Sequence, residues 1–467
     1  MKSNDKYNLK YVWLICLVAA MGGLLFGYDW IVVGGAKPFY EPYFHLDSPH
    51  LKGFGTSSAL IGCMFGAMLC GTLSDKVGRK RLLIMSGLLF MISAVGTALS
   101  NTFLWFNIYR IIGGIAMGHA LNLSPMYIAE ISPTKVRGML VSVNQLTVMI
   151  GVLSAQVVNW LISLYDTQMP DNATAEMILQ SWNGQYGWRW MFAAETIPAS
   201  LFFLLMFLVP ESVRWLVKDG QDSRAERILE KIGGADYARV EVANIKDTLS
   251  SEEIARVNFR DLLEPKLLKI ILIGVFLAVL QQWCGMNVIF YYAADIFQAA
   301  GYNIKQTMLN IVVIGLVMTV SVFITIGTVD KVGRKTLMLV GTSALAVIYG
   351  LIGYSFHSNI TGLPIVLLTL ANVAFYSFTL APVTWVLLSE IFPNRIRGAA
   401  MSISVIALWI GSFTLTYSFP TLNENLGTAQ IFWLYGVICA VGFIFILFKL
   451  PKTKGKSLEQ IERELVD

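Results

Sequence analysis

Three ionisable side chains lie in stretches of the sequence that are otherwise apolar. Asp29 follows GGLLFGY, Arg110 lies in NIYRIIGG, and Glu195 lies in MFAAETIPA. A charge in such a stretch is costly unless it is paired, so its presence points to function. An arginine beside an aspartate holds the aspartate ionised. Protonating Asp29 would release Arg110 to another acceptor such as Glu195, and this is the chemistry of a proton-driven switch.

These three residues support two interpretations. They fall at similar depths in their stretches, so they are expected to meet in the folded protein. One interpretation is the proton switch, and the other is a static buried ion pair that fixes how the helices align. The residue types alone favour neither.

A second polar group lies in the stretch LQQWCGMN at 280–287. Gln281, Gln282 and Asn287 each offer a hydrogen-bond donor and an acceptor, which suits the hydroxyls of a sugar. Unpaired amides are costly in lipid, so these must face protein partners or a wet cavity, and Gly285 lets the helix loosen there. Hydrogen bonds between helices are the alternative role. Other candidate contacts are Gln145, Trp385, Tyr291 and Trp409.

Long apolar stretches must position these side chains. The chain has 467 residues, of which 55% are hydrophobic and 14% charged, whereas a soluble protein is about 25% charged. A membrane-spanning helix needs about 20 apolar residues, and a barrel strand only about 9–11 alternating ones. We therefore predict an all-α membrane protein with twelve spanning helices. They cover residues 12–33, 57–74, 82–100, 104–126, 139–163, 188–210, 267–297, 307–329, 336–356, 364–389, 398–419 and 429–449.

The basic residues predict the orientation of these spans. Most of the 35 Lys and Arg residues fall in the loops on the side of the two termini, and the opposite loops hold Lys37, Lys52 and Lys305. Cytoplasmic loops carry the excess of basic residues. We expect a multi-pass protein of the cell (inner or plasma) membrane with both termini in the cytoplasm. The net charge of +5 reflects this bias, so we expect no nucleic-acid partner.

Two motifs recur at almost the same offset. DKVGRK occurs at 75–80 and at 330–335, and EISPTKVRG at 130–138 is echoed by EIFPNRIRG at 390–398. Repeats six spans apart predict two parallel six-helix halves. We assign 1–210 and 267–449 to the halves, 211–266 to a cytoplasmic helical linker, and 450–467 to a cytoplasmic tail.

The repeated motifs predict an ion-pair network in each half. Gly78 and Gly333 permit tight turns, and acidic and basic residues flank them. Such a network would hold the cytoplasmic side together in one state and break in another. The simpler alternative is that these residues only form turns and supply the cations of cytoplasmic loops. That role does not require the repeated acidic residues. The predicted members are Asp75, Arg79, Glu130, Arg137, Asp330, Arg334, Glu390 and Arg397.

The sequence contains no motif for catalysis. It has no phosphate-binding loop, nucleophile motif or metal-ligand spacing, and its five cysteines all fall in apolar stretches. We therefore expect no enzymatic activity, no cofactor and no metal.

Several motifs resemble those of one family along nearly the whole chain. They are GTLSDKVGRKR, YRIIGG, SPMYIAEISPTKVRG, PESVRW, QQWCGMNVIFYYA, SEIFPNRIRG and PKTKGKSLEQI. The chain resembles the sugar porters of the major facilitator superfamily, and among them most of all the bacterial xylose:proton symporter. PESVRW and the QQ…N…YY pattern are specific to sugar porters, whereas the repeated hexamer DKVGRK is typical of the whole superfamily.

The resemblance implies a proton-coupled symporter for a monosaccharide such as xylose or glucose, working by alternating access. Proton-coupled members carry Asp at the position of Asp29, whereas the uniporting glucose facilitators carry Asn. The amides and Trp385 match sugar-contacting positions of the family. Leu408 and Met318 stand where relatives carry amides, so the identity of the sugar is open.

The resemblance also sets the expected partners and the alternatives. We expect a monosaccharide, the coupling proton and the lipid bilayer as partners of a monomeric chain. A uniporter of the same fold is one alternative, which Asp29 disfavours. A non-transporting sugar receptor is the other, and the short segment after the last span disfavours it.

Overall fold

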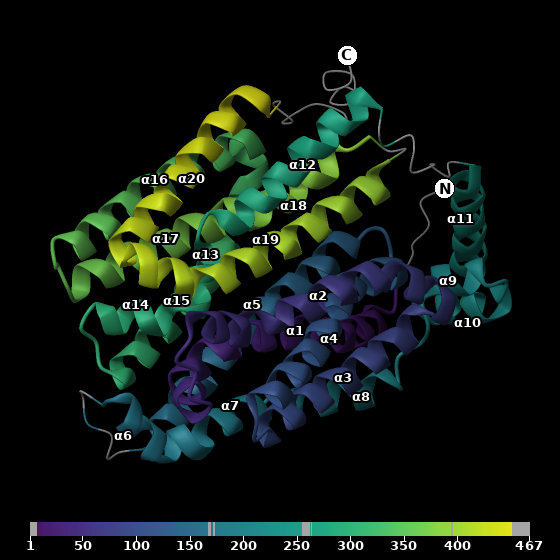
Figure 1. The fold of residues 1–467 in the computed structure, drawn as a ribbon. Helices are drawn as coiled ribbons and strands as arrows, with labels where there is room; N and C mark the ends of the chain where they lie inside the picture. Colours follow the sequence, from purple (N-terminus) through teal and green to yellow (C-terminus); the bar gives the residue numbers. More distant parts are fainter. Residues whose placement is uncertain are drawn as a thin grey trace. The chain divides into compact units, whose positions relative to one another are not determined.

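The structure is a computed structural model in which every regular element of the described residues is a helix (Figure 1). It describes residues 7–166, 170, 173–254, 262, 264–393 and 396–450, except for the side chains of 251–254 and 325–331. The predicted tail, apart from Leu450, and much of 255–263 in the predicted linker lie outside this description.

The helices of the first six predicted spans are α1 (Leu9–Tyr43), α2 (Pro49–Val77), α3 (Arg79–Leu99), α4 (Phe103–Ile131), α5 (Arg137–Ser163) and the pair α7 (Trp188–Ala193) and α8 (Thr196–Met206). A short helix α6 (Ala175–Gln180) and a π-helical turn η1 (Asn183–Gly187) precede α7. The linker consists of α9 (Val213–Lys218), α10 (Asp222–Gly233) and α11 (Ala235–Ile254).

The last six predicted spans contain α12 (Pro265–Trp283), α13 (Met286–Tyr291), α14 (Ala293–Ala299), α15 (Ile304–Val332), α16 (Arg334–His357), α17 (Leu363–Phe378), α18 (Leu380–Ile391), α19 (Arg397–Leu426) and α20 (Thr428–Lys449). Within the described residues, ten helical stretches are long and apolar enough to cross a membrane. With α4 and the α7–α8 pair, the helices match the twelve predicted spans, and the fold class is confirmed.

Three predicted spans differ in detail from the structure. Helix α1 continues to Tyr43, ten residues beyond the predicted end at 33, so Lys37 lies in a helix and not in a loop. The span predicted at 188–210 is interrupted between α7 and α8, and the span at 267–297 is divided into α12, α13 and α14. Apolar length alone cannot detect such breaks, because the residues on both sides remain apolar.

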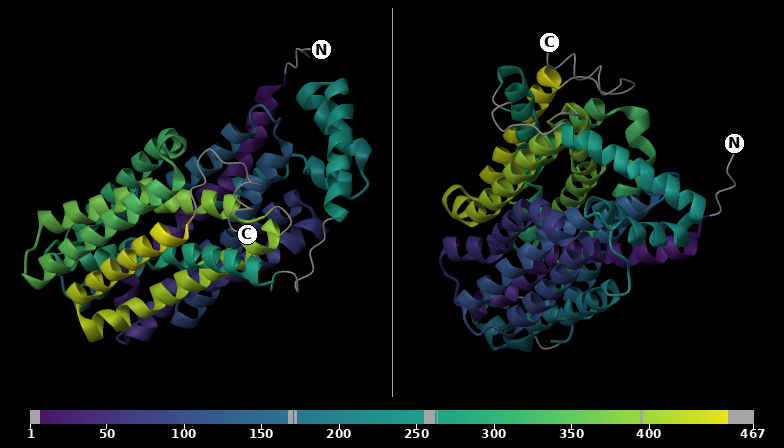
Figure 2. Two further views of the ribbon diagram at one scale, coloured as in Figure 1. Left: turned by 90° about the horizontal axis from the view of Figure 1, so that it is seen from above. Right: turned by 90° about the vertical axis from the view of Figure 1, so that its right-hand side faces the viewer.

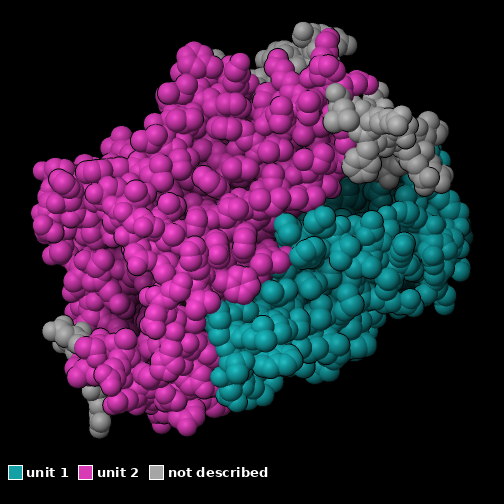
Figure 3. Space-filling view, in the orientation of Figure 1, with its two compact units in different colours: residues 1–30, 62–154, 192–256 teal, residues 31–61, 155–191, 257–467 magenta. Residues whose placement is uncertain are grey.

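The chain forms two compact units, which have separate colours in Figure 3. Unit 1 comprises 1–30, 62–154 and 192–256, and unit 2 comprises 31–61, 155–191 and 257–467. The division passes through α1, α2, α5 and α7, so part of each of these helices belongs to unit 2.

In unit 1, the linker helices have a small core of their own. Helix α3 packs against α4 and α8, while α10 packs against α11 and α9. Trp215, Leu216 and Leu229 lie in the apolar core of α9–α11. The backbone N–H of Asn8 donates to the Ile232 carbonyl (2.8 Å), which holds the start of α1 beside α10 and α11 (Figures 1 and 2).

In unit 2, α16 packs against α20 and α17, and α12 packs against α19 and α18. The stretch α12–α14 is interrupted twice. Gly285 adopts a left-handed conformation (φ +84°) between α12 and α13, and Tyr292 (φ −119°, ψ 19°) separates α13 from α14. These breaks free backbone groups and redirect the chain near the predicted amide cluster.

Both copies of the repeated hexamer form the same turn. Gly78 separates α2 from α3 with φ +99°, and Gly333 separates α15 from α16 with φ +97°. Glycine takes such a conformation at no steric cost. The predicted tight turns are thus present in the structure. We call the ends of the helices at these turns the linker side, because α9 contacts the first turn there.

Candidate functional site

Asp29, Arg110 and Glu195 form one buried cluster in unit 1. The guanidinium of Arg110 on α4 donates through Nη1 to Asp29 Oδ1 on α1, and through Nη2 to the Asp29 carbonyl (3.2 Å). The residues are 0%, 2% and 1% exposed, in the order Asp29, Arg110, Glu195. Glu195 interacts electrostatically with both others and lies at the break between α7 and α8. The structure therefore brings together the three charges that the sequence singles out.

The surroundings of Asp29 leave its second carboxylate oxygen in a confined space. A Cβ at Gly113 would lie 2.8 Å from Oδ2, so glycine at this position makes room for the carboxylate. Asp29 Oδ2 and Glu195 Oε1 are both buried, and neither has a hydrogen-bond partner among the described residues. The Phe192 ring lies 5.3 Å from Arg110 Cζ and covers the guanidinium. The cluster is thus a buried ion pair with two acceptor oxygens to spare.

The predicted amides form a hydrogen-bonded chain in unit 2. Gln281 Nε2 donates to the Ala381 carbonyl on α18 (2.9 Å), and Gln282 Nε2 donates to Gln281 Oε1 (3.2 Å). Asn287 Nδ2 donates to Gln282 Oε1 (2.5 Å) and to Ser412 Oγ on α19 (2.8 Å). The break at Gly285 lets Asn287 turn back toward Gln282. These hydrogen bonds fix the orientation of the three amides.

Ser412 is a member of this chain that the sequence analysis did not identify. It lies one helical turn beyond Leu408 on α19, so the two residues share a helix face. A serine in an apolar helix does not by itself indicate a functional site, because its hydroxyl more often donates to a backbone carbonyl of the same helix.

The remaining predicted contact residues differ in exposure. Trp385 on α18 is 36% exposed. Trp409 and Tyr291 are buried, and Trp409 Nε1 has no hydrogen-bond partner among the described residues. Gln145 on α5 is exposed and belongs to unit 1, whereas the other predicted contacts belong to unit 2. Leu408 and Met318 are both buried.

The glycine at the helix break is expected to be sensitive to substitution. In Gly285→Ala, the added Cβ would lie 2.7 Å from the Tyr435 ring and 2.9 Å from the Tyr349 hydroxyl, at φ +84°. We expect a loss of about 1–3 kcal/mol of stability, seen as a lower Tm of the purified protein.

Gly350→Ala is the matched control for this substitution. Gly350 lies inside helix α16, where no heavy atom lies within 4 Å of the added Cβ. This variant is expected to be neutral or more stable by about 0.5–1 kcal/mol. Equal Tm values for the two variants would contradict a conformational requirement at Gly285.

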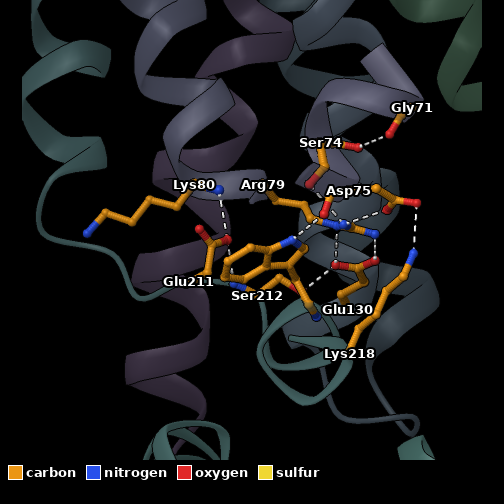
Figure 4. Close-up of polar contacts among 10 residues, drawn as sticks. Gly71, Ser74, Asp75, Arg79, Lys80, Glu130, Glu211, Ser212 and Lys218 are labelled. Atoms are coloured by element: carbon orange, nitrogen blue, oxygen red, sulfur yellow. Dashed lines mark hydrogen bonds and ion pairs between the residues drawn. The ribbon is translucent and has the colours of Figure 1, made fainter. Parts of the chain in front are cut away.

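On the linker side, the first hexamer forms an ion-pair network with the end of α4 (Figure 4). Arg79 donates to both carboxylate oxygens of Glu130 (3.1 Å each) and to Asp75 Oδ1 (2.9 Å). Arg79 is 7% exposed, so these bonds are largely shielded from water. Bidentate arginine–carboxylate pairs are strong and directional. This network joins α2, α3 and α4.

The linker motif PESVRW extends this network, which the sequence analysis did not foresee. Ser212 Oγ donates to Glu130 Oε2, and Trp215 Nε1 donates to the Asp75 carbonyl (2.9 Å). Lys218 Nζ bonds Asp75 Oδ2 (2.8 Å). In the sequence, the PESVRW motif indicates a resemblance to sugar porters, but it does not indicate these contacts. Figure 4 shows Ser212 beside Glu130 and Lys218 beside Asp75.

The second repeat shows the same pairing. Arg334 Nε on α16 donates to Glu390 Oε1 at the end of α18 (3.1 Å), and Arg334 Nη2 forms an ion pair with the same oxygen (3.1 Å). The hexamer lysines also match: Lys80 Nζ donates to the Phe207 carbonyl after α8 (2.8 Å), and Lys335 Nζ donates to the Leu450 carbonyl after α20 (2.6 Å). Cations at the carbonyl ends of helices are favourable.

Two predicted members of the network, Arg137 and Arg397, stand apart from these pairs. Arg397 donates to the Phe392 carbonyl (3.2 Å). Among the described residues, Arg137 forms no ion pair with Glu130, and Arg397 forms none with Glu390. The side chain of Asp330 lies outside the described residues.

The described residues also contain no group of His, Cys, Asp and Glu suited to hold a metal.

Comparisons with known proteins agree with one another. The family model "Sugar (and other) transporter" matches residues 15–465. An arabinose-proton symporter of Bacillus subtilis is 37% identical, and the alignment covers 98% of this chain and 96% of that protein. A D-xylose-proton symporter of Escherichia coli is 38% identical, with the same coverage. The inward-open structure of the E. coli xylose transporter XylE superposes with a TM-score of 0.84 at 37% identity, covering 97% of this chain and 99% of that one.

Proposed function

Because the chain belongs to the sugar transporter family of the major facilitator superfamily, we propose that it is a proton-coupled monosaccharide symporter. Its central site opens alternately to the two sides of the membrane. The sugar and the proton move inward together, and the proton gradient drives the accumulation of the sugar. Relatives are named for arabinose, xylose and glucose, so a pentose or hexose is the proposed substrate class.

One observation carries the proton coupling: Asp29 is fully buried, is paired with Arg110, and has Glu195 beside it. A proton that reaches Asp29 neutralises the carboxylate and removes its attraction for Arg110. Arg110 remains buried and cationic, so it turns to the Glu195 carboxylate, which has a spare oxygen. The guanidinium then holds the helix break between α7 and α8 in place of α1. Protonation is in this way converted into a change of helix contacts.

The amide chain of unit 2 supplies the proposed sugar contacts. Gln282 and Asn287 are oriented by Gln281 and Ser412, so their remaining donor and acceptor positions are fixed for sugar hydroxyls. Trp385 offers a ring face for the apolar side of the sugar. Gln145, Tyr291 and Trp409 complete the proposed set. Leu408 and Met318 add apolar surface, which favours a sugar that lacks a hydroxyl at that point.

The proposed orientation places the linker side in the cytoplasm of a cell membrane, with the two termini on that side. Cytoplasmic loops carry the excess of Lys and Arg, and the basic hexamers lie at the linker-side turns. The ion-pair networks of Arg79 and Arg334 then act as the cytoplasmic gate. We propose that the protein works as a monomer, with the proton as the coupling ion and without a further cofactor.

Uptake by proteoliposomes tests this function directly. A panel of labelled pentoses and hexoses is offered to the purified protein, with and without an inward proton gradient. With one proton per sugar, a gradient of one pH unit supports up to about tenfold accumulation, so we expect uphill uptake of at least one sugar, abolished by a protonophore. Downhill entry that ignores the gradient would indicate a uniporter, and binding without entry would indicate a receptor.

A further inference from the structure

A buried lysine lies in unit 2, near the C-terminal end of α1. Lys37 on α1 is 3% exposed, and its Nζ lies 2.5 Å from Asp295 Oδ2 on α14 and 3.4 Å from Glu41 Oε1. The Tyr292 ring lies 4.6 Å from the same nitrogen. An ammonium this deeply buried persists only with such partners. The pair joins residues 258 positions apart, so it ties the helix of the first predicted span to that of the seventh.

The second break in the α12–α14 stretch places Asp295 next to Lys37. Tyr292 ends α13, and its hydroxyl donates to the Thr416 carbonyl on α19 (2.8 Å). Its ring also packs against Phe419 at 4.5 Å. Tyr292 is therefore anchored to α19, and α14 starts from that anchor. At Gly34, α1 approaches so closely that a Cβ would lie 2.6 Å from the Phe290 carbonyl oxygen.

The two acidic partners of Lys37 differ in what happens to them when the contact opens. Glu41 is four residues away on the same helix, so it stays beside Lys37 whatever α14 does. The side chain of Asp295 is 47% exposed, so water can hydrate it after release. The three residues also line a polar cavity of about 540 Å³, together with Asp47, Lys52 and Glu176. Separating α14 from α1 therefore leaves no charge buried without a partner.

We propose that Lys37 and Asp295 form a reversible ion lock that closes the outer mouth of the transporter. The proposal rests on the alternating-access function above and assigns the closure of that mouth to two residues. The lock is made when α14 packs on α1, and it breaks when α14 moves away to admit sugar. Glu41 stabilises the ammonium in both states, so the lock adds a contact to the closed state without a large barrier to opening.

Distances between spin labels in the absence of sugar test the lock. Cysteines are introduced at the exposed positions Leu99 and Leu363, which lie at the ends of α3 and α17 away from the linker-side turns. The five native cysteines are buried and leave the labelling selective. Lys37→Asp places three acidic groups together. We expect the ratio of long to short distances to rise about tenfold, equal to about 1.4 kcal/mol.

The exchanged pair is the decisive variant. Lys37→Asp combined with Asp295→Lys restores opposite charges and should return the distances to those of the unmodified protein. Asp295→Asn is a milder opening variant, which serves if Lys37→Asp fails to fold. Lys305→Met is the matched control, because it removes a lysine outside this cluster, and it should change nothing.

The outcomes separate this proposal from the general function. Unchanged distances in Lys37→Asp and Asp295→Asn would overturn the lock even if the unmodified protein accumulates sugar. A shift in Lys37→Asp that the exchanged pair fails to reverse would also overturn it, because the effect would then be steric. A failure of the unmodified protein to take up any sugar would instead contradict the proposed function and leave the label distances as a separate result.

Discussion

Replacing Asp29 by asparagine is expected to abolish uphill sugar accumulation while sugar exchange continues. Asparagine has the shape of the protonated acid but cannot release or accept the proton. Arg110 then loses its ionised partner in every step of the cycle, so the proton gradient no longer biases the helices. The accumulation ratio in proteoliposomes should fall from up to about tenfold per pH unit to about one. Counterflow of labelled sugar against unlabelled sugar should persist.

Asp236→Asn provides the matched control for this variant. It makes the same change of aspartate to asparagine on α11, at an exposed position outside the Asp29 cluster. We expect it to accumulate sugar normally. If Asp29→Asn accumulated sugar as the unmodified protein does, the pair with Arg110 would be a static element that fixes helix alignment, and the proposed coupling would be wrong.

Replacing Gln282 by alanine is expected to cause the largest loss of sugar affinity. Gln282 connects Gln281 to Asn287, and its removal leaves Gln281 Oε1 and Asn287 Nδ2 without this partner. The proposed sugar contacts of the Gln282 amide are lost as well. Each hydrogen bond contributes about 0.5–1.5 kcal/mol, so two of them contribute about 1–3 kcal/mol. We expect the KM for sugar uptake to rise by about 10–100-fold. Initial uptake rates over a range of sugar concentrations give this value.

Asn122→Ala is the control that separates ligand contact from packing. Asn122 also lies in a membrane helix, but its Nδ2 donates to the Gly118 carbonyl of the same helix (2.8 Å). Its loss should leave the KM nearly unchanged. If Gln282→Ala lowered the Tm but left the KM of the remaining folded protein unaltered, the amide chain would hold helices together and would not bind sugar.

The class of the fold and the turns at the repeated motifs could be predicted from the sequence. A membrane demands long apolar helices, so apolar length located all twelve spans even where their ends were misplaced. The repeated hexamer predicted two equivalent turns, and Gly78 and Gly333 both adopt the required positive φ. Asp29, Arg110 and Glu195 were identifiable because a charge in an apolar stretch stands out against its neighbours.

The tertiary structure decided which polar groups meet. Lys37 looked like a loop cation because its neighbourhood includes prolines and polar residues, and only the extension of α1 buries it against Asp295. Ser412 looked like an ordinary helix serine until Asn287 was turned toward it by the break at Gly285. Partners far apart in the chain leave no periodic signal in the sequence around either residue. Only the packed backbone can bring such groups into contact, because their distance depends on helix breaks and crossings that apolar length does not encode.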